Sequence, residues 1–397
     1  MIVSHLALIG ASGTNKVMAG ELVRLSKRAF EAAQLDEPIK EGLGALLYPF
    51  DPTLAALAFT WHRTSSRVLW DLYRSDAVRL EPLYEELLAD VTGDTRPWLA
   101  DLPDDGATFS ITPGATQEFA AGGRQLVGVL KNALVEGAAR QGKRLTVDPE
   151  HPHLNFSLRV HDGFVTASLD LGGQGMHLRG YRTEGGGTAP LRETLAATLV
   201  MLARHDARNE ALIDPMAGSG TLAIEAACMA QARPVWVPPR TAAAATMPLF
   251  AEELPAAPGP LFGDTQPVIF ANEIDRQTFE RSRLNVTRAG VAEFVEQKCG
   301  DFRHIDSERL KAQVRARGLS SDHGVILCNP PYGERLDPPA LGGLYRDLGV
   351  WCRRFPGWRA AFIVANPDFE PAFGGVPRIK KPLSNGSLRA YFLMYDL

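Results

Sequence analysis

The sequence predicts a mixed α/β protein whose C-terminal half is built on a parallel, Rossmann-like β-sheet. Three features of the 397-residue chain support this. From Ala211 onward, short apolar runs alternate with helical patterns, as in a parallel sheet whose strands are joined by helices. A glycine-rich turn, Gly218–Gly220, closely follows the first of those runs. Roughly residues 1–170 have the pattern of a smaller α/β unit, so we expect more than one domain.

The N-terminal part contains one well-defined helical pattern and one hairpin. Leu126–Arg140 carries apolar residues at helical spacing. Asn155–Val160 and Gly163–Leu171 are predicted to be paired strands, because Asp162-Gly163 is a typical turn dipeptide. Thr183–Thr188 is rich in glycine and is predicted to be a linker.

Strands and helices are predicted to alternate in the C-terminal part. Its first helix is expected over Leu191–Arg204, with Pro190 in the first turn, where a missing N–H costs little. The expected strands are Ala211–Asp214, Val268–Ala271, Val325–Cys328, Ala360–Ala365 and Ala390–Tyr395. The expected helices between them are Thr221–Gln231 and Arg276–Ala289. Residues 233–266 are rich in proline and alanine and are predicted to be an insertion.

The composition is that of a soluble globular protein, with 45% apolar and 22% charged residues. No apolar run is long enough to span a membrane. Met1–Gly10 is predicted to be a strand rather than a signal peptide, because it lacks a basic start and a cleavage site. The four cysteines form no Cys-x-x-Cys pair, which argues against disulfides and zinc and favours the cytoplasm. The net charge of -4 is compatible with RNA binding through a local basic patch.

The first chemical motif is the loop Asp214–Thr221, between the first strand and its helix. Glycines there let the backbone approach a ligand closely, and the helix N-terminus behind them favours an anionic group. The alternative interpretation is a tight structural turn. The residues expected to bind a cofactor are Asp214, Met216, Gly218, Ser219, Gly220 and Thr221.

Two later strand ends carry further candidate cofactor contacts. An acid at the end of the next strand can accept hydrogen bonds from two ribose hydroxyls. Glu273 is nearest that strand end, with Ile274 beside it, whereas Asp275 is expected to cap the following helix. Asp301 can accept from an adenine amino group, with Phe302 packed near the ring; a simple turn aspartate is an equally good interpretation.

A second turn with glycines, Gly10–Gly13, also follows an apolar run. It lacks the spacing of a phosphate-binding loop and the third glycine of a dinucleotide-binding loop. We therefore predict that it is a structural turn.

The most specific motif is Asn329-Pro330-Pro331-Tyr332, directly after a predicted strand. A ring-conjugated amino group is a poor nucleophile, because its lone pair is delocalised. The Asn329 side-chain oxygen and the Pro330 carbonyl can accept its two N–H bonds, and both bonds strengthen as positive charge grows on nitrogen. Tyr332 offers a face on which an extruded base can stack. Asn329, Pro330 and Tyr332 are the predicted catalytic residues, and Asn329 is also expected to contact the cofactor. The alternative interpretation of the motif is a proline-rich structural turn.

Together, these motifs resemble the class I methyltransferases with an N-terminal THUMP domain, and within them the bacterial guanine-N2 RNA methyltransferases. The resemblance covers roughly residues 55–397. It rests on Asp214–Thr221, Asn272–Asp275 and Asn329–Leu336, with shorter similar stretches at Ser66–Leu69, Ser168–Leu171, Arg179–Arg182, Ala189–Glu193 and Asn385–Gly386.

The resemblance implies a ferredoxin-like region at 1–60, an α+β THUMP-type RNA-binding domain at 61–172 and a Rossmann-like methyltransferase domain at 189–397. It implies S-adenosylmethionine as the cofactor, no metal, and methyl transfer to guanine N2 in rRNA or tRNA, with rRNA favoured. Lys131, Arg179 and Arg182 are candidate contacts to RNA phosphates.

Three alternatives stay open. The Asn-Pro-Pro-Tyr motif also serves enzymes that methylate adenine N6 in DNA or a glutamine side chain in release factors. The first kind usually carries a target-recognition domain, and the second usually lacks an upstream RNA-binding unit. A non-catalytic RNA-binding assembly factor is the third alternative, which failure to bind S-adenosylmethionine would favour.

Overall fold

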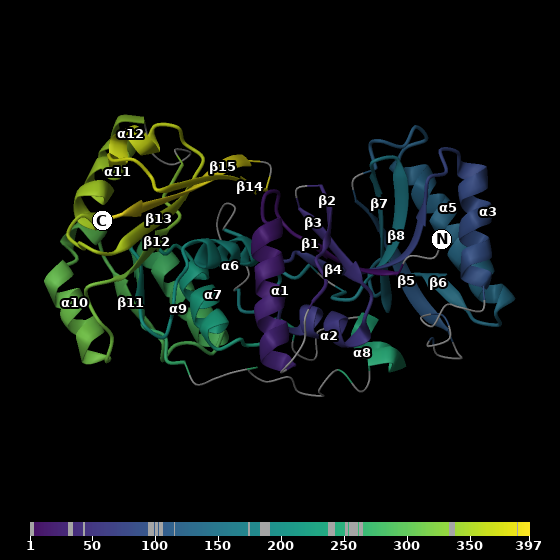
Figure 1. Cartoon of the computed structure of the whole chain (residues 1–397), viewed down its shortest axis with the longest axis horizontal. Coiled ribbons are helices and arrows are strands. Elements are labelled where there is room, and N and C mark those ends of the chain that lie inside the picture. The colour runs from purple at the N-terminus through teal and green to yellow at the C-terminus, as the bar shows by residue number, and fades with distance from the viewer. Residues whose placement is uncertain are drawn as a thin grey trace. The chain divides into compact units, whose positions relative to one another are not determined.

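The computed structural model describes residues 4–30, 35–42, 44–93, 99, 102, 106–114, 116–173, 175–182, 191–236, 243–250, 253, 261, 265–332, 338–386 and 388–397. The chain forms two compact units (Figure 1). The N-terminal unit contains Met1–Gly10, Met18–Met176 and Pro234–Gly259, and the C-terminal unit contains Ala11–Val17, His177–Arg233 and Pro260–Leu397.

The N-terminal unit is built on an eight-stranded mixed sheet. In spatial order its strands are β2 (Ile39–Glu41), β3 (Ala45–Pro49), β1 (His5–Ile9), β4 (Arg67–Ser75), β8 (Phe164–Asp170), β7 (Leu154–His161), β5 (Ala107–Pro113) and β6 (Leu145–Val147). Its helices include α1 (Asn15–Ala29, whose first residues belong to the C-terminal unit), α2 (Pro52–Trp61), α3 (Leu80–Thr92), α5 (Gly123–Arg140) and the short α8 (Ala243–Thr246) and η1 (Pro248–Phe250).

The helix and the hairpin predicted in this unit are confirmed. Helix α5 begins three residues earlier than expected and buries Leu126, Leu130 and Leu134 on one face. Strands β7 and β8 pair in antiparallel fashion. Asp162 and Gly163 between them have φ values of 49° and 76°, the left-handed pair that a two-residue hairpin turn requires.

The C-terminal unit is a seven-stranded sheet with helices on both faces. In spatial order its strands are β11 (Val295–Cys299), β10 (Ile269–Glu273), β9 (Ala211–Asp214), β12 (Gly324–Cys328), β13 (Arg359–Val364), β15 (Leu388–Asp396) and β14 (Ile379–Asn385). β15 is antiparallel to both of its neighbours, and the pairs from β11 to β13 are parallel. This arrangement confirms the predicted α/β, Rossmann-like fold.

Two hydrophobic cores cover the faces of this sheet. One contains residues of α6 (Glu193–Leu202), α7 (Thr221–Ala230) and α9 (Arg276–Arg288). The other contains residues of α10 (Ser307–Ala316), α11 (Pro338–Cys352) and α12 (Phe369–Phe373), with the fully buried Trp351 and Trp358 (Figure 1). Helix α6 begins at Glu193, two residues later than predicted. Pro190, the predicted linker 183–188 and much of the predicted insertion lie outside the described residues.

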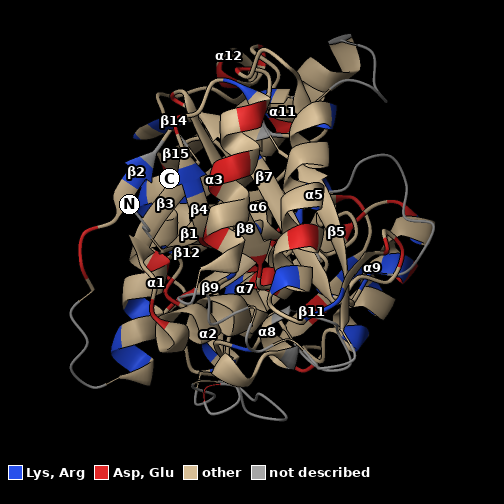
Figure 2. Ribbon diagram, turned by 90° about the vertical axis from the view of Figure 1, so that its right-hand side faces the viewer, with Lys and Arg blue, Asp and Glu red and all other residues tan. Residues whose placement is uncertain are grey.

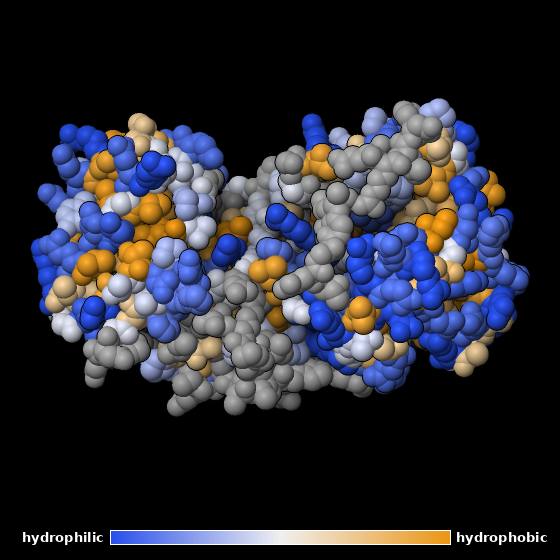
Figure 3. Space-filling model, turned by 180° about the vertical axis from the view of Figure 1, so that it is seen from behind, coloured by the Kyte–Doolittle hydropathy of each residue, from blue (hydrophilic) through white to orange (hydrophobic). Residues whose placement is uncertain are grey.

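The surface is mixed in charge and hydropathy. Helix α3 carries four acidic residues and no basic one, whereas the neighbouring α5 carries three basic residues and one acidic one (Figure 2). Exposed apolar side chains form small groups between hydrophilic ones (Figure 3). Within the described part of the chain, no helix combines the length and apolar character needed to cross a membrane.

Candidate active site

The predicted site residues follow the carboxyl ends of adjacent parallel strands. Asp214 ends β9, Glu273 ends the neighbouring β10, and Asn329 directly follows β12 on the other side of β9. The chain order reverses between β9 and β12, and ligands of open α/β sheets bind at such a reversal. The fold therefore brings the cofactor loop and the Asn-Pro-Pro-Tyr loop to one place.

Asp214 is a buried carboxyl group, only 1% exposed. Its Oδ1 accepts a hydrogen bond from the Met216 amide at 3.2 Å. Burial raises the pKa of Asp214 from 3.8 to about 8. The hydrogen bond from Met216 lowers the pKa only in part, and the nearby negative charge of Glu273 raises it further. A buried acid at this position is suited to a cationic group of a ligand.

The two glycines of the loop have different surroundings. Gly220 has a φ of +85°, and a Cβ there would lie 2.6 Å from Ser282 Oγ, so helix packing requires glycine. Gly218 has a φ of +56° and faces open space. Asn285 donates to the Ser219 carbonyl at 3.0 Å and fixes the loop from behind. The open side at Gly218 leaves room for a ligand.

Glu273 holds this loop against β10. Its Oε2 accepts from the Gly218 amide at 2.8 Å, and its Oε1 accepts from the Asp275 amide at 2.9 Å. Each carboxylate oxygen can still accept a further bond, as a ribose diol would require. Asp275 caps α9 by accepting from the Thr278 amide at 2.8 Å, as predicted. Ile274 is 65% exposed beside the strand end.

Asn272 is a structural member of the site that its sequence position alone does not predict. Its side-chain amide donates to the carbonyls of Pro215 at 3.1 Å and Gly300 at 2.8 Å, and its backbone carbonyl accepts from the Ala217 amide at 2.7 Å. Asn272 therefore joins the loops that follow β9 and β11. Its position at the end of a buried strand is the one signal in the sequence for this role.

Asp301 and Phe302 follow β11. Asp301 accepts from the Arg303 amide at 3.0 Å and from its guanidinium at 2.8 Å. Burial alone would raise the pKa of Asp301, but these bonds and the charge of Arg303 hold it below its ordinary value. Phe302 is 4% exposed and packs edge-on against Trp351, so its ring belongs to the core.

The Asn-Pro-Pro-Tyr loop is anchored by residues that its motif does not contain. The Tyr345 hydroxyl donates to the Pro331 carbonyl at 2.6 Å, and Asn366 donates to the Tyr332 carbonyl at 3.4 Å. Within the loop, the Tyr332 hydroxyl donates to Asn329 Oδ1, the atom predicted to accept from the substrate amino group. Tyr345 and Asn366 lie far along the chain, so no local pattern linked them to this loop.

The candidate RNA contacts have different environments. Lys131 is exposed on α5. The side chain of Arg179 is 3% exposed and lies 3.6 Å from the buried carboxylate of Glu225. Arg182 pairs with the buried Glu193 and extends to Thr221 Oγ1 at 3.1 Å. A phosphate contact by Arg179 would thus require a buried ion pair to open, whereas Lys131 is accessible.

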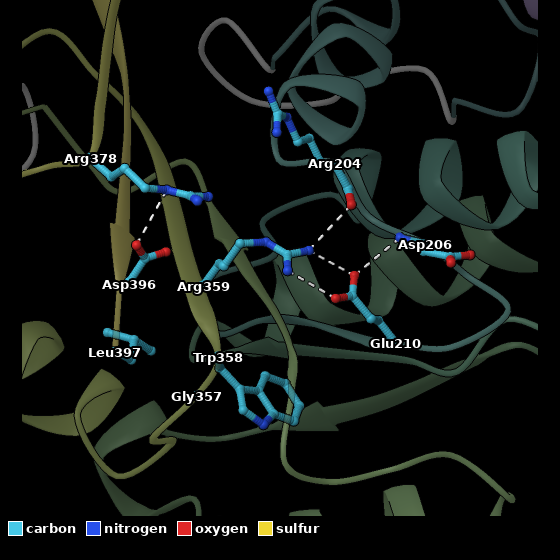
Figure 4. A pocket seen from close by; sticks show the side chains of 9 residues that line it. All are labelled: Arg204, Asp206, Glu210, Gly357, Trp358, Arg359, Arg378, Asp396 and Leu397. Carbon is cyan, nitrogen blue, oxygen red and sulfur yellow. Dashed lines mark hydrogen bonds and ion pairs between the residues drawn. The ribbon is translucent and has the colours of Figure 1, made fainter.

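A pocket of about 390 Å³ lies at the opposite edge of the same sheet (Figure 4). It is lined by residues at the amino ends of β9, β13 and β14 and at the end of β15. Arg359 forms two hydrogen bonds with Glu210, at 2.9 and 2.7 Å, and Arg378 pairs with Asp396 at 3.3 Å. Because these charges neutralise one another and the chemical motifs lie at the other edge, we assign this pocket a structural role.

The strand order and the loops at its reversal define a class I methyltransferase, which uses S-adenosylmethionine as methyl donor. Residues 179–391, slightly more than half of the chain, match the RMKL-like methyltransferase domain family, and the chain belongs to this family. The predicted methyltransferase chemistry and cofactor are thereby confirmed, while the THUMP domain stays a prediction.

Three similar proteins illustrate the relationship. The ribosomal RNA large subunit methyltransferase K/L of Desulfotalea psychrophila is 29% identical over 387 residues, which is 93% of this chain but 50% of that protein. The chain thus spans about half the length of this curated relative. A possible methylase from Clostridium difficile has a TM-score of 0.79 and 27% identity, covering 99% of this chain and 98% of that one. A predicted N6-adenine-specific DNA methylase from Listeria monocytogenes has a TM-score of 0.76 and 26% identity, covering 99% and 96%.

Proposed function

We propose that the protein transfers a methyl group from S-adenosylmethionine to the exocyclic N2 amino group of a guanosine in RNA, with rRNA as the favoured substrate over tRNA. The observation that carries this proposal is the position of Asn329–Tyr332 after β12, beside the Asp214 loop. The resemblance of these motifs to guanine-N2 enzymes and the name of the Desulfotalea relative support the RNA substrate.

The residues at the strand ends fit the cofactor. Asp214 is a buried acid suited to a cationic group, Glu273 offers two carboxylate oxygens, and Gly218 leaves open space. Met216, Ser219, Gly220, Thr221, Ile274, Asp301 and Phe302 complete the proposed cofactor contacts. S-adenosylmethionine supplies the methyl group when bound there.

The proposed catalytic step begins with a hydrogen-bond exchange. The Tyr332 hydroxyl, which now donates to Asn329 Oδ1, leaves that atom free for the substrate amino group. Asn329 Oδ1 and the Pro330 carbonyl then accept the two N–H bonds, and the ring of Tyr332 stacks on the base. Both acceptors stabilise the positive charge that develops on nitrogen, and no strong base is needed.

For RNA recognition we propose that residues 61–172 form a THUMP-type domain with Lys131 as a phosphate contact. Arg124 is exposed two helical turns before Lys131 on α5, so both cations lie on one face of that helix. The environment of Arg179 and Arg182 favours a structural role for them instead. The target base is then flipped out of its stack to reach Asn329.

Adenine N6 methylation is the second candidate, because the similar Listeria protein is described as an adenine-specific DNA methylase. The same acceptors would orient that amino group. The two functions therefore differ in the nucleic acid and the base, and the chemistry of Asn329 does not separate them.

The experiment is to incubate the protein with radiolabelled S-adenosylmethionine and, separately, unmodified rRNA, tRNA and DNA, and to identify the labelled nucleoside. Asn329→Ala is the control, which should bind S-adenosylhomocysteine and transfer no label. Labelled N2-methylguanosine from rRNA is the expected result. Labelled N6-methyladenosine, or its deoxy form, would overturn the base assignment, and no label in any pool would overturn the nucleic-acid substrate.

A further inference from the structure

Two lysines of the C-terminal unit, Lys16 and Lys381, lie near each other. Lys16 is exposed in the first turn of α1, and Lys381 is partly buried in β14. Burial and the nearby charge of Lys16 together hold the pKa of Lys381 below its ordinary value. Over the described residues neither lysine has an acidic partner, whereas the adjacent Lys380 pairs with Glu370.

The segment Ala11–Val17 brings the two lysines together, because it covers the open edge of β14. The Ser12 amide donates to Ser384 Oγ at 3.1 Å. Gly13 has a φ of +85°, and a Cβ there would lie 2.9 Å from the Pro382 carbonyl oxygen. The turn at Gly10–Gly13 thus has the structural role predicted for it, and it leads into the first turn of α1, which carries Lys16.

The strand register puts Lys381 at the level of Asn329. Asn329 lies one residue beyond Cys328, and Lys381 lies one residue beyond Lys380. Both steps run toward the carboxyl ends of the parallel strands. The lateral distance is three strand spacings, about 14 Å. Cys328 and Lys380 are themselves at one level of the sheet, because the register pairs Cys328 with Phe362, Phe362 with Leu393, and Leu393 with Lys380.

We propose that Lys16 and Lys381 bind a phosphodiester group of the RNA strand near the target base. This inference rests on the proposed RNA substrate and adds a contact within the catalytic unit itself. A phosphate supplies the negative charge that no described acidic residue provides to the two ammonium groups. A backbone contact at this level positions the strand without reading its sequence while the flipped base reaches Asn329.

The chemistry of this surface fits a phosphodiester. Ammonium groups bind phosphate as point charges. Because the site shares an edge with the base-binding loop, a strand that enters that loop passes within reach of it.

The test is the affinity of the full-length K16Q/K381Q variant for a labelled single-stranded RNA, measured by fluorescence anisotropy over a series of KCl concentrations. Each lost contact should reduce the slope of log affinity against log salt by about 0.7, which is the single-strand value per phosphate. The affinity for S-adenosylhomocysteine, measured by calorimetry, should equal that of the wild type and shows that the catalytic unit is folded.

K380Q is the matched control, because it removes a neighbouring lysine that already has a carboxylate partner. Its salt slope should equal that of the wild type. If wild-type protein binds the RNA and K16Q/K381Q has the same affinity and slope, the inference fails while the proposed function stands. If K380Q lowers the slope as much as the double variant, the effect is one of net charge and the inference also fails. If wild-type protein neither binds nor methylates RNA, the proposed function fails and the inference fails with it.

Discussion

Asp214 ends β9 as a buried carboxyl group with a raised pKa, and this has a consequence for stability. An acid whose pKa is higher in the folded than in the unfolded protein destabilises the fold as the pH rises between the two values. For Asp214 this window runs from the ordinary value of 3.8 to about 8. At neutral pH the folded protein therefore holds Asp214 mainly as the neutral acid, whereas the unfolded chain ionises it, and this difference costs stability.

Asp214→Asn should accordingly raise the thermal midpoint of unfolding. Its advantage over the wild type should grow as the pH rises toward about 8 and stay constant above that value, because the asparagine does not ionise. Thermal unfolding of both proteins across a pH series measures this. The variant should also lose affinity for S-adenosylhomocysteine. A difference in midpoint that is independent of pH would contradict the prediction.

The environments of Arg179 and Lys131 predict opposite effects of charge reversal. Arg179→Glu adds a carboxylate next to the buried Glu225, and breaking such a buried pair typically costs about 3–5 kcal/mol. Its unfolding midpoint should fall clearly. Lys131→Glu changes an exposed helical position, so its midpoint should be nearly unchanged while its RNA affinity decreases. Calorimetric unfolding and RNA-binding measurements on both variants distinguish a structural residue from an RNA contact. An Arg179→Glu protein with wild-type stability would refute the structural role of Arg179.

In the turn between β9 and α7, one glycine is required by helix packing and the other faces open space. Gly220→Ala places a methyl group 2.6 Å from Ser282 Oγ in α9, so it should lower the unfolding midpoint. Gly218→Ala meets open space and costs only the left-handed conformation, about 1–2 kcal/mol. It should instead mainly weaken S-adenosylhomocysteine binding, because its methyl group enters the ligand space. Equal losses of stability in the two variants would argue against this division.

At the scale of the whole molecule, the C-terminal unit is not a continuous stretch of chain. Ala11–Val17 belongs to it and covers the free edge of β14. A fragment that begins at His177 would expose this edge, and open strand edges promote association between molecules. We expect the fragment 177–397 to associate and to unfold at a lower temperature than the full chain, as measured by size-exclusion chromatography and calorimetry. A monomeric fragment with the full chain's midpoint would show that the covering segment is dispensable.

Much of the fold could be predicted because it depends on neighbours in the sequence. Strand β9 matches its predicted bounds, since a short apolar run before a glycine turn has few other conformations in such a sheet. The β7–β8 hairpin follows from Asp162-Gly163, because this dipeptide tolerates left-handed backbone at both positions. The motifs likewise occur at strand ends that the alternation of strands and helices had already located.

The fold class, and the strand ends at which the Asp214, Glu273 and Asn329 motifs begin, follow from the sequence alone. The contacts between distant residues depend on the packing of the whole fold: Arg179 pairs with Glu225, Asn272 joins the loops after β9 and β11, and Tyr345 anchors the Asn-Pro-Pro-Tyr loop. The physical reason is that backbone conformation is set by local sterics and turn chemistry. The partners of buried charges and amides are set instead by the packing of whole elements, which no local pattern records.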